Sequence, residues 1–152
     1  MHLKFNQSSI QKASTKKLKV YTALNNNIAI LKLFPGINHQ TVNAILNIKG
    51  IKAIVLETFG SGNASTEHWF LKSIEQAVKK GIVIYDVTQC RAGSVELGKY
   101  ETSAGLKKAG VISGKDITTE AAVAKLMFLL GRKESTNTIK KSLETSLRGE
   151  MG

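Results

Sequence analysis

Runs of apolar residues separated by amphipathic stretches predict strands that alternate with helices along most of the chain. The strand candidates are nearly continuous Val, Ile and Leu runs at residues 28–34, 51–58 and 81–88. Apolar residues recur at helical spacing in residues 39–50, 67–81, 104–110, 116–133 and 135–150. Strands without polar alternation are buried on both faces, so the pattern predicts a parallel sheet with helices on both sides.

The predicted fold class is therefore α/β, a small flavodoxin-like or Rossmann-like three-layer sandwich with a mainly parallel sheet. Local signals place the helix ends: Thr118 and Ser135 are expected to be N-caps, and Gly50 and Gly81 follow helix C-termini. A short strand is also predicted at residues 95–97. The apolar face of the 116–133 helix is assigned to Ala122, Leu126, Met127 and Leu130.

The chain divides into a polar N-terminal segment and one compact domain. Residues 6–18 are polar, rich in Lys and without apolar period, so residues 1–18 are predicted to form an interdomain linker or mobile arm. Residues 19–152 then form the domain, because a chain of 152 residues is long enough for a single well-buried core.

Net charge and composition limit the kinds of molecule that the protein is expected to bind. The formal net charge is +11, but only three of the 22 basic residues are Arg, and aromatic residues make up 6%. Specific nucleic-acid readers rely on Arg forks and stacked aromatic rings, so a solvated Lys-rich surface is favoured over a specific nucleic-acid site. A single cysteine excludes an internal disulfide, and no apolar window reaches the length of a membrane span. We therefore expect a cytoplasmic protein that binds no membrane.

The stretch LETFGSGN, residues 56–63, is the richest candidate for a binding site. Gly60 and Gly62 allow a ligand to approach the backbone, although a strand-to-helix turn that needs its glycines for geometry alone is an equally good interpretation. The spacing excludes a dinucleotide fingerprint and a phosphate-binding P-loop. Ligands of parallel sheets meet the loops at the carboxyl ends of the strands, which here are residues 35–38, 58–65 and 88–93.

Other chemical groups give weaker candidates. Cys90 follows a strand end, where nucleophiles occur, although a small buried hydrophobe is the favoured interpretation. Glu96 and Glu101 are candidate acids in a long loop, with solvated surface charge favoured for Glu96. The three histidines are isolated from one another and from acids, so neither a metal site nor a cofactor is predicted.

Taken together, four segments resemble the C-terminal domain of type I (cytoplasmic) bacterial L-asparaginases. They are LETFGSGN, KKGIVIYDVTQCRAGSV, KYETSAGLKKAGVISGKDITTEAAVAKLMFLLG and the terminal LRGEM. The resemblance covers residues 19–151, and TQC followed by GSV is specific to the family in combination with GVI-x-G-x-D-x-T-x-EA-x-x-KL. It implies that residues 19–152 are the C-terminal domain of a two-domain enzyme.

The resemblance implies an enzyme that hydrolyses L-asparagine to L-aspartate and ammonia through a threonine nucleophile, without metal or cofactor. In the family that threonine lies in a TGGTI-type segment of the N-terminal domain, and this sequence contains no TGGT. The chain alone is therefore expected to be inactive. Its expected partners are the N-terminal asparaginase domain, L-asparagine in the intact enzyme and further copies in a homo-oligomer.

The resemblance also assigns site residues to this chain. The substrate-binding candidates are Ser61, Gly62 and Asn63, and the regulatory or accessory candidates are Thr88, Gln89, Cys90 and Glu101. Two departures from the family are visible. Ser65 replaces a proline that relatives commonly carry, and Glu57 stands near a position where relatives can carry a basic residue. The second departure weakens the expectation that asparagine regulates this protein.

Two alternatives remain. One is a stand-alone flavodoxin-like binding or interaction module, which would act through the LETFGSGN and TQC loops. The other is the related subunit of the archaeal tRNA-dependent amidotransferase, which would use the positive charge on tRNA but needs an additional N-terminal domain. For a C-terminal domain without its covering domain, apolar surface at the strand ends predicts self-association.

Overall fold

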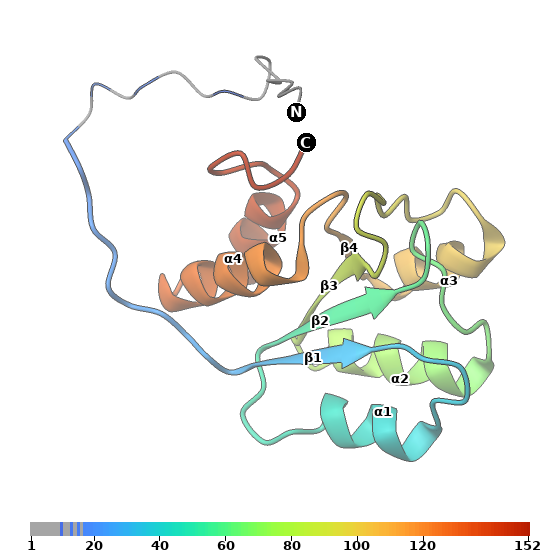
Figure 1. Cartoon of the computed structure of the whole chain (residues 1–152). Helices are drawn as coiled ribbons and strands as arrows, with labels where there is room; N and C mark the ends of the chain where they lie inside the picture. Colours follow the sequence, from blue (N-terminus) through green and yellow to red (C-terminus); the bar gives the residue numbers. More distant parts are fainter. Residues whose placement is uncertain (1–9, 11–12, 14, 16) are drawn as a thin grey trace.

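The computed structural model describes residues 10, 13, 15 and 17–152. In this part of the chain, four parallel strands form one sheet in the order β1-β2-β3-β4 (Figure 1). The predicted alternation of strands and helices is confirmed. The strands are β1 (Ile28–Lys32), β2 (Ala53–Thr58), β3 (Val83–Thr88) and β4 (Ile112–Ser113). The helices are α1 (His39–Leu46), α2 (His68–Lys79), α3 (Glu101–Ala109), α4 (Thr119–Gly131) and α5 (Thr136–Leu143).

Alternate strand residues point to opposite sides of the sheet, so both faces carry apolar side chains. Helices cover both of these faces. Ile54 and Ile84 pack with residues of α1, α2 and α3 in one buried cluster. Val55 and Tyr85 pack with residues of α4 and α5 in another. Figure 1 shows the two layers of helices with the sheet between them. The structure therefore confirms the three-layer α/β sandwich.

The strand order decides where ligands can bind. Each parallel connection passes through one helix, α1, α2 or α3, on the same face of the sheet, and α4 and α5 follow β4 on the other face. The strand order therefore does not reverse within the described residues. Doubly wound sheets usually bind ligands in a crevice at such a reversal, which these four strands do not form. A site must instead be built from the loops at the strand ends.

Three local predictions are wrong, and one strand is missed. The helix predicted over residues 135–150 ends at Leu143. Residues 95–97 form no strand, because the Val95 amide donates to the Lys115 carbonyl (2.8 Å) as an isolated contact. The two-residue strand β4 has no counterpart in the predictions, since so short a strand leaves no apolar period in the sequence. The first helix ends at Leu46 rather than near Gly50, because Asn47 already forms its C-cap.

The buried face of α4 also differs from the prediction. Two expected core residues, Met127 and Leu130, are only half-buried. The predicted N-cap is confirmed, because Thr118 Oγ1 accepts a hydrogen bond from the Ala121 amide (3.2 Å). The unexpected buried residue is Lys125, a residue type that is almost never buried unless it is paired. The residues that α4 buries are Ala122, Lys125, Leu126 and Leu129.

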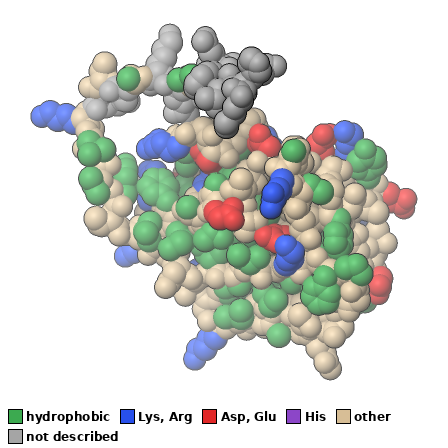
Figure 2. Space-filling model, viewed as in Figure 1, with side chains coloured by type: hydrophobic (Ala, Val, Ile, Leu, Met, Phe, Trp, Pro, Cys, Tyr) green, Lys and Arg blue, Asp and Glu red, His purple; other side chains and the backbone are tan. Residues whose placement is uncertain are grey.

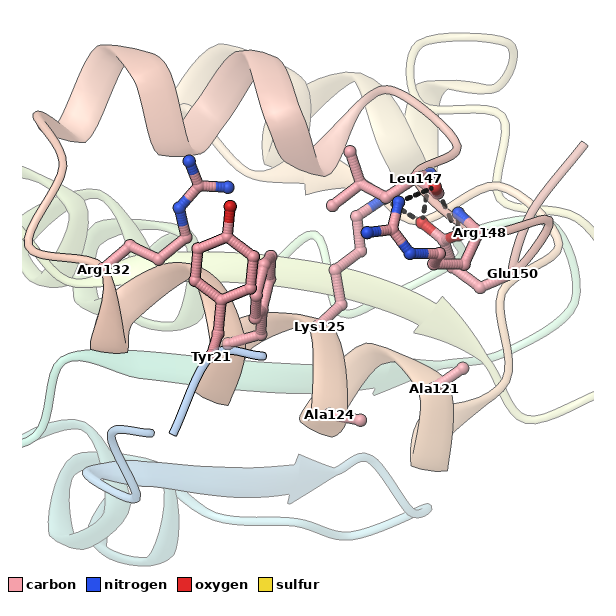
Figure 3. A pocket seen from close by; sticks show the side chains of 9 residues that line it. Tyr21, Ala121, Ala124, Lys125, Arg132, Leu147, Arg148 and Glu150 are labelled. Carbon is pink, nitrogen blue, oxygen red and sulfur yellow. Dashed lines mark hydrogen bonds and ion pairs between the residues drawn. The ribbon is translucent and has the colours of Figure 1, made fainter. Parts of the chain in front are cut away.

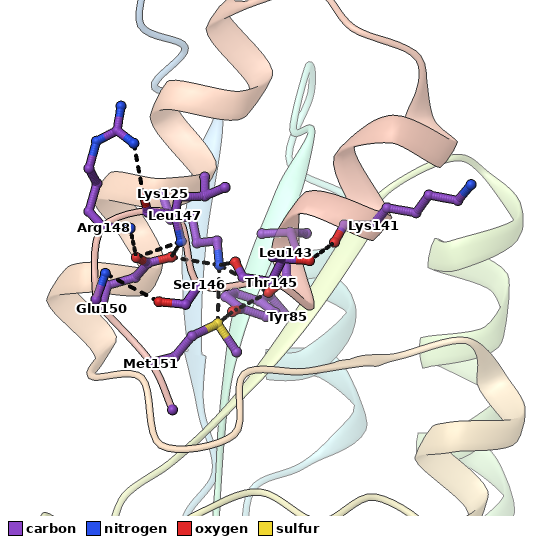
Figure 4. A network of polar contacts seen from close by, with 12 residues as sticks. Tyr85, Lys125, Lys141, Leu143, Thr145, Ser146, Leu147, Arg148, Glu150 and Met151 are labelled. Carbon is purple, nitrogen blue, oxygen red and sulfur yellow. Dashed lines mark hydrogen bonds and ion pairs between the residues drawn. The ribbon is translucent and has the colours of Figure 1, made fainter. Parts of the chain in front are cut away.

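Lys125 is buried because the C-terminal loop surrounds its ammonium group with acceptors (Figure 4). Its Nζ forms an ion pair with Glu150 Oε1 (2.8 Å) and donates to the carbonyls of Thr145 (2.7 Å) and Leu143 (3.1 Å). Burial alone would raise the pKa of Glu150, but hydrogen bonds from Lys125 and from backbone amides outweigh it and lower the pKa to about 2. The Glu150 carboxyl is therefore ionised at neutral pH, and its contact with Lys125 holds the LRGEM segment against α4.

Residues 17–27 form neither helix nor strand, and the part from Tyr21 to Asn25 contacts α4 near its C-terminal end (Figure 1). The Tyr21 ring meets the Phe128 ring edge to face, with centroids 5.4 Å apart. Most of the predicted linker or mobile arm at residues 1–18 lies outside the described residues.

Candidate functional site

The three loops predicted to carry a site lie together at the carboxyl edge of the sheet (Figure 1). Gln89 joins them: its side-chain amide donates to the Leu33 carbonyl (2.8 Å) and to the Glu57 carbonyl (2.9 Å). The Gln89 backbone amide also donates to the Thr58 carbonyl (3.0 Å). One residue therefore bridges the ends of β1, β2 and β3, which gives Gln89 a structural role independent of any ligand.

The loop that contains Ser61, Gly62 and Asn63 turns tightly after β2. Gly62 has a φ of +103°, and a Cβ there would lie 3.1 Å from Val95 Cγ1, so glycine alone fits this position without strain. The Asn63 amide donates to the Phe59 carbonyl (2.8 Å) and closes the turn. These contacts support the interpretation that the glycines are needed for the shape of the turn. A ligand would then be contacted by the side chains next to the glycines.

The chain between β3 and α3 holds this turn in place. Thr102 Oγ1 donates to Asn63 Oδ1 (2.6 Å), and the Glu96 amide donates to the Ser61 carbonyl (3.0 Å). Ser61 and Asn63 are both half-buried. Among the described residues, no hydrogen bond uses the side-chain NH₂ group of Asn63, so this donor is available to a ligand.

Thr88, Cys90 and Glu101 differ in their surroundings. Thr88 Oγ1 donates to the Gly60 carbonyl and accepts from the Cys90 amide (3.1 Å), so it fixes the turn after β3. Cys90 is exposed, which corrects the expectation of a small buried hydrophobe. The reason is that β3 ends at Thr88, so the chain has already left the sheet at Cys90. Glu101 is exposed in the first turn of α3, where a carboxylate complements the helix dipole.

A first hollow, the Cys90 hollow, opens between the strand ends and the N-terminus of α4, with a volume of about 290 Å³. At its edge Glu57 Oε2 forms an ion pair with Lys32 (3.2 Å), and Thr119 Oγ1 donates to Glu57 Oε1 (2.6 Å). Arg91, Asp116 and Glu120 also line the hollow, so the lining carries both positive and negative charges. A lining with both signs of charge suits a small polar ligand that itself carries both.

A second hollow, the Asn63 hollow, lies between the loops that follow β1 and β2, with a volume of about 360 Å³. Its lining includes the partly exposed rings of Phe34 and Phe59. Asn63, Ser65 and Glu67 add polar groups to this apolar lining. A mostly apolar hollow with a few polar groups is the usual composition of a small-molecule or interface site.

The structure divides the predicted site residues between these two hollows. The regulatory candidates that line the Cys90 hollow are Thr88, Gln89 and Cys90. Of the substrate-binding candidates, Asn63 lines the Asn63 hollow. The remaining candidates, which line neither hollow, are Ser61, Gly62 and Glu101.

Glu57 and Thr119 were not predicted as lining residues of the same hollow. Glu57 interrupts the apolar run of β2, and a buried charged residue near a strand end is the signal that could have identified it. Thr119 belongs to α4, far along the chain, so only the folded structure brings the two together.

Asp86 places an ionisable group beneath the turn at Gly62. Its side chain is completely buried, and Oδ1 accepts a hydrogen bond from Thr58 Oγ1 (2.8 Å). Oδ2 is buried without a hydrogen-bond partner among the described residues, and a Cβ at Gly62 would lie 3.4 Å from it. Burial raises the pKa of Asp86 to about 7, and the Thr58 hydrogen bond offsets only part of this increase. A group that titrates near neutrality therefore lies directly under the candidate loop.

The chemistry that these groups offer is binding and orientation. Within the described part of the chain, no group of three or more His, Cys, Asp and Glu side chains could hold a metal ion. No helix among residues 17–152 is long and apolar enough to cross a membrane. The strand-end loops instead provide hydrogen-bond donors and paired charges in fixed positions beside two small hollows.

Comparison with known proteins places this arrangement in a family. Residues 27–143 match the Glutaminase/Asparaginase C-terminal domain. The chain belongs to this family. L-asparaginase 1 of Escherichia coli (strain K12) is 38% identical over 135 residues, which are 89% of this chain and 40% of that protein. A subunit of the glutamyl-tRNA(Gln) amidotransferase of Pyrococcus abyssi (strain GE5 / Orsay) is 33% identical over 149 residues, which are 98% of this chain and 33% of that protein.

The asparaginase C-terminal domain fold is also found in solved structures. The crystal structure of L-asparaginase I from Vibrio cholerae O1 biovar eltor str. N16961 matches with a TM-score of 0.85 at 38% identity, and the match covers 91% of this chain and 41% of that chain. The resemblance to the C-terminal domain of type I asparaginases is thereby confirmed. The chain spans 33% to 41% of the length of these three proteins.

Proposed function

We propose that the intact protein is an L-asparaginase that hydrolyses L-asparagine to L-aspartate and ammonia in the cytoplasm. The observation that carries the proposal is the likeness to L-asparaginase I of Vibrio cholerae, with a TM-score of 0.85 at 38% identity. The similar identity to L-asparaginase 1 of Escherichia coli supports the same substrate. The proposed reaction is acyl transfer to a threonine of an N-terminal domain, with an oxyanion hole and without metal or cofactor.

In this enzyme, residues 1–18 connect the two domains and residues 19–152 supply loops to the active site. We assign substrate contacts to Ser61, Gly62 and Asn63. Asn63 has the strongest support, because its side-chain NH₂ group is available at the edge of the Asn63 hollow. Glu101 is assigned an accessory role, since it precedes Thr102, whose hydroxyl donates to Asn63 (2.6 Å).

The Cys90 hollow is assigned an effector role. Its lining of both charges suits a free amino acid, whose ammonium and carboxylate groups are both ionised at neutral pH. Thr88, Gln89 and Cys90 form one side of the hollow. Glu57 would bind the ammonium group of such a ligand by exchanging its ion pair with Lys32 (3.2 Å), in contrast to the basic residue that relatives can carry near this position.

The chain alone is proposed to be inactive and to act within a homo-oligomer. Inactivity is supported by the sequence, which contains no TGGT segment. Oligomer formation is supported by apolar side chains that remain exposed between scattered charges on the face shown in Figure 2. Near the strand ends, Phe34 is 51% exposed and Phe59 is 39% exposed. Burying such rings against another domain or another copy of the chain would be favourable.

The test joins this chain to the N-terminal domain of Escherichia coli L-asparaginase 1 and measures ammonia release from asparagine. The fusion is expected to hydrolyse asparagine, whereas the chain alone is not. Asn63→Ala should lower kcat/KM of the fusion at least tenfold. The matched control is Asn137→Ala, an exposed position in α5 that should leave kcat/KM unchanged. Turnover by the isolated chain would contradict its inactivity, and a folded fusion without turnover would contradict the assignment.

A second candidate function is that of the related amidotransferase component. The observation that favours it is the 33% identity to the Pyrococcus abyssi amidotransferase protein over 98% of this chain, together with a net charge of +11. It predicts tRNA binding that survives at roughly 0.15 M salt, which filter binding would measure. Binding that disappears at this salt concentration would count against a specific tRNA role.

A further inference from the structure

A third hollow, the Tyr21 hollow, lies outside the strand-end loops and has no part in the proposed function (Figure 3). Its volume is about 350 Å³, within the range of small-molecule sites in proteins. Three parts of the chain form its walls: α4, the extended segment that contains Tyr21, and the C-terminal loop. Chain segments far apart in sequence therefore enclose one space.

The walls from α4 and the extended segment provide flat apolar surface with room beside it. The Tyr21 and Phe128 rings are perpendicular to each other, with an interplanar angle of 89°. The Arg132 guanidinium lies 5.3 Å from the centroid of each ring, which holds the pair by cation–π attraction. Ala121 and Ala124, from the same face of α4, fill little of the space. A planar apolar group would find contacts here without displacing a side chain.

Positive charge is in excess around the hollow. Lys125 pairs with Glu150 (2.8 Å), and Arg132 pairs with Glu134 (2.6 Å), so these two cations are neutralised. Arg148 lies at the opposite end of the hollow from Arg132, and its guanidinium donates to a backbone carbonyl (2.8 Å). Within residues 17–152, no carboxylate forms an ion pair with the Arg148 side chain. An anionic group would therefore be attracted to the Arg148 end.

The wall that carries Arg148 is held rigidly. The Glu150 carboxylate accepts from the backbone amides of Leu147 (2.9 Å) and Arg148 (2.6 Å) while it pairs with the buried Lys125. Figure 4 shows this loop closed over the ammonium group. A preformed wall lowers the entropy that a ligand must lose to bind, because little of the protein has to become ordered.

We propose that the Tyr21 hollow is a binding site for an aromatic carboxylate. The ring of this ligand would lie against Phe128 and the small side chains of α4. The ligand carboxylate would accept hydrogen bonds from the Arg148 guanidinium. The planar fork of Arg is suited to a carboxylate, which it can bind through two parallel hydrogen bonds. The proposal concerns the isolated chain and does not depend on the activity of the intact enzyme.

The experiment titrates the full chain with indole-3-acetate and with its neutral isostere indole-3-acetamide, using calorimetry and backbone amide NMR. The carboxylate is expected to bind at least tenfold more tightly than the amide. Its chemical-shift changes are expected to centre on Tyr21, Phe128 and Arg148. Equal affinity of the two compounds, shift changes centred elsewhere, or the absence of saturable binding would overturn the proposal.

Variants separate charge recognition from general surface binding. Arg148→Gln should weaken the binding of indole-3-acetate at least tenfold. Lys72→Gln removes the same charge from an exposed position on α2 and should leave the affinity unchanged. Ala124→Leu should weaken binding, because the larger side chain occupies part of the hollow. Thermal unfolding checks that each variant is folded. Unchanged affinity in a folded Arg148→Gln variant would overturn the proposal even if Ala124→Leu failed to fold.

Discussion

Replacing Asp86 by Asn should remove a large part of the pH dependence of stability. The Asp86 carboxyl is completely buried, with one hydrogen bond from Thr58 and one oxygen without a partner among the described residues. Burial raises its pKa from 3.8 to about 7. At roughly 1.4 kcal/mol per pKa unit, this difference corresponds to about 4 kcal/mol of unfolding free energy.

The sign of the effect follows from which state keeps the proton. Below about pH 4 both the folded and the unfolded chain carry a protonated Asp86. Between there and about pH 7 the unfolded chain ionises first, so the free energy of unfolding falls as the pH rises. Glu150 acts in the opposite direction at lower pH, because its folded-state pKa is about 2 and the stability that it contributes is lost as the pH falls.

Urea unfolding followed by circular dichroism from about pH 4.5 to about pH 8 tests this reasoning. The difference in unfolding free energy between wild type and Asp86→Asn should change by about 3 kcal/mol or more over that range, with wild type losing stability as the pH rises. Glu144→Gln, at an exposed carboxylate that forms no ion pair among the described residues, is the matched control; this variant should still lose stability as the pH rises, because Asp86 is intact. Parallel curves for wild type and Asp86→Asn would refute the burial argument.

Two substitutions and one labelling experiment test the loops. Gln89→Ala should cost about 2 kcal/mol of unfolding free energy, measured in urea, because the Leu33 carbonyl loses its side-chain donor and the Glu57 carbonyl keeps only the Leu33 amide; no loss would contradict the bridging role. Gly62→Ala should lower stability by about 1–3 kcal/mol more than Gly36→Ala, since both have positive φ but only Gly62 is crowded; equal losses in thermal unfolding would argue against crowding. Cys90 is exposed and should react fully with Ellman's reagent in the folded protein; a thiol that reacts only after unfolding would disprove its exposure.

The main elements were predictable because their burial is continuous along the sequence. Strands such as β2 are covered on both faces, so they appear as unbroken apolar runs, and helix starts such as Thr118 carry a capping side chain. The strand β4 was not predictable in the same way, because it pairs through only two residues. Its place is fixed by β3 rather than by its own pattern.

The candidate site was predictable only in part, since its hollows combine residues that are distant in sequence. The loops after the strands were found from glycine and polar positions, but the contact between Glu57 and Thr119 depends on how α4 meets the sheet. The exposure of Cys90 depends on where β3 ends, since Val87 within the same strand is still completely buried. Burial of Lys125 likewise depends on acceptors supplied by the C-terminal loop.

The buried ammonium of Lys125 also sets an order for assembly during synthesis. Its carboxylate partner, Glu150, leaves the ribosome well after α4 has been made. The groups that surround its Nζ all come from residues 143–151, so before they are in place α4 could pack against the sheet only with this ammonium group still open to water. The face of the sheet covered by α1, α2 and α3 can therefore close first, and the α4 face completes its packing only when the C-terminal loop arrives.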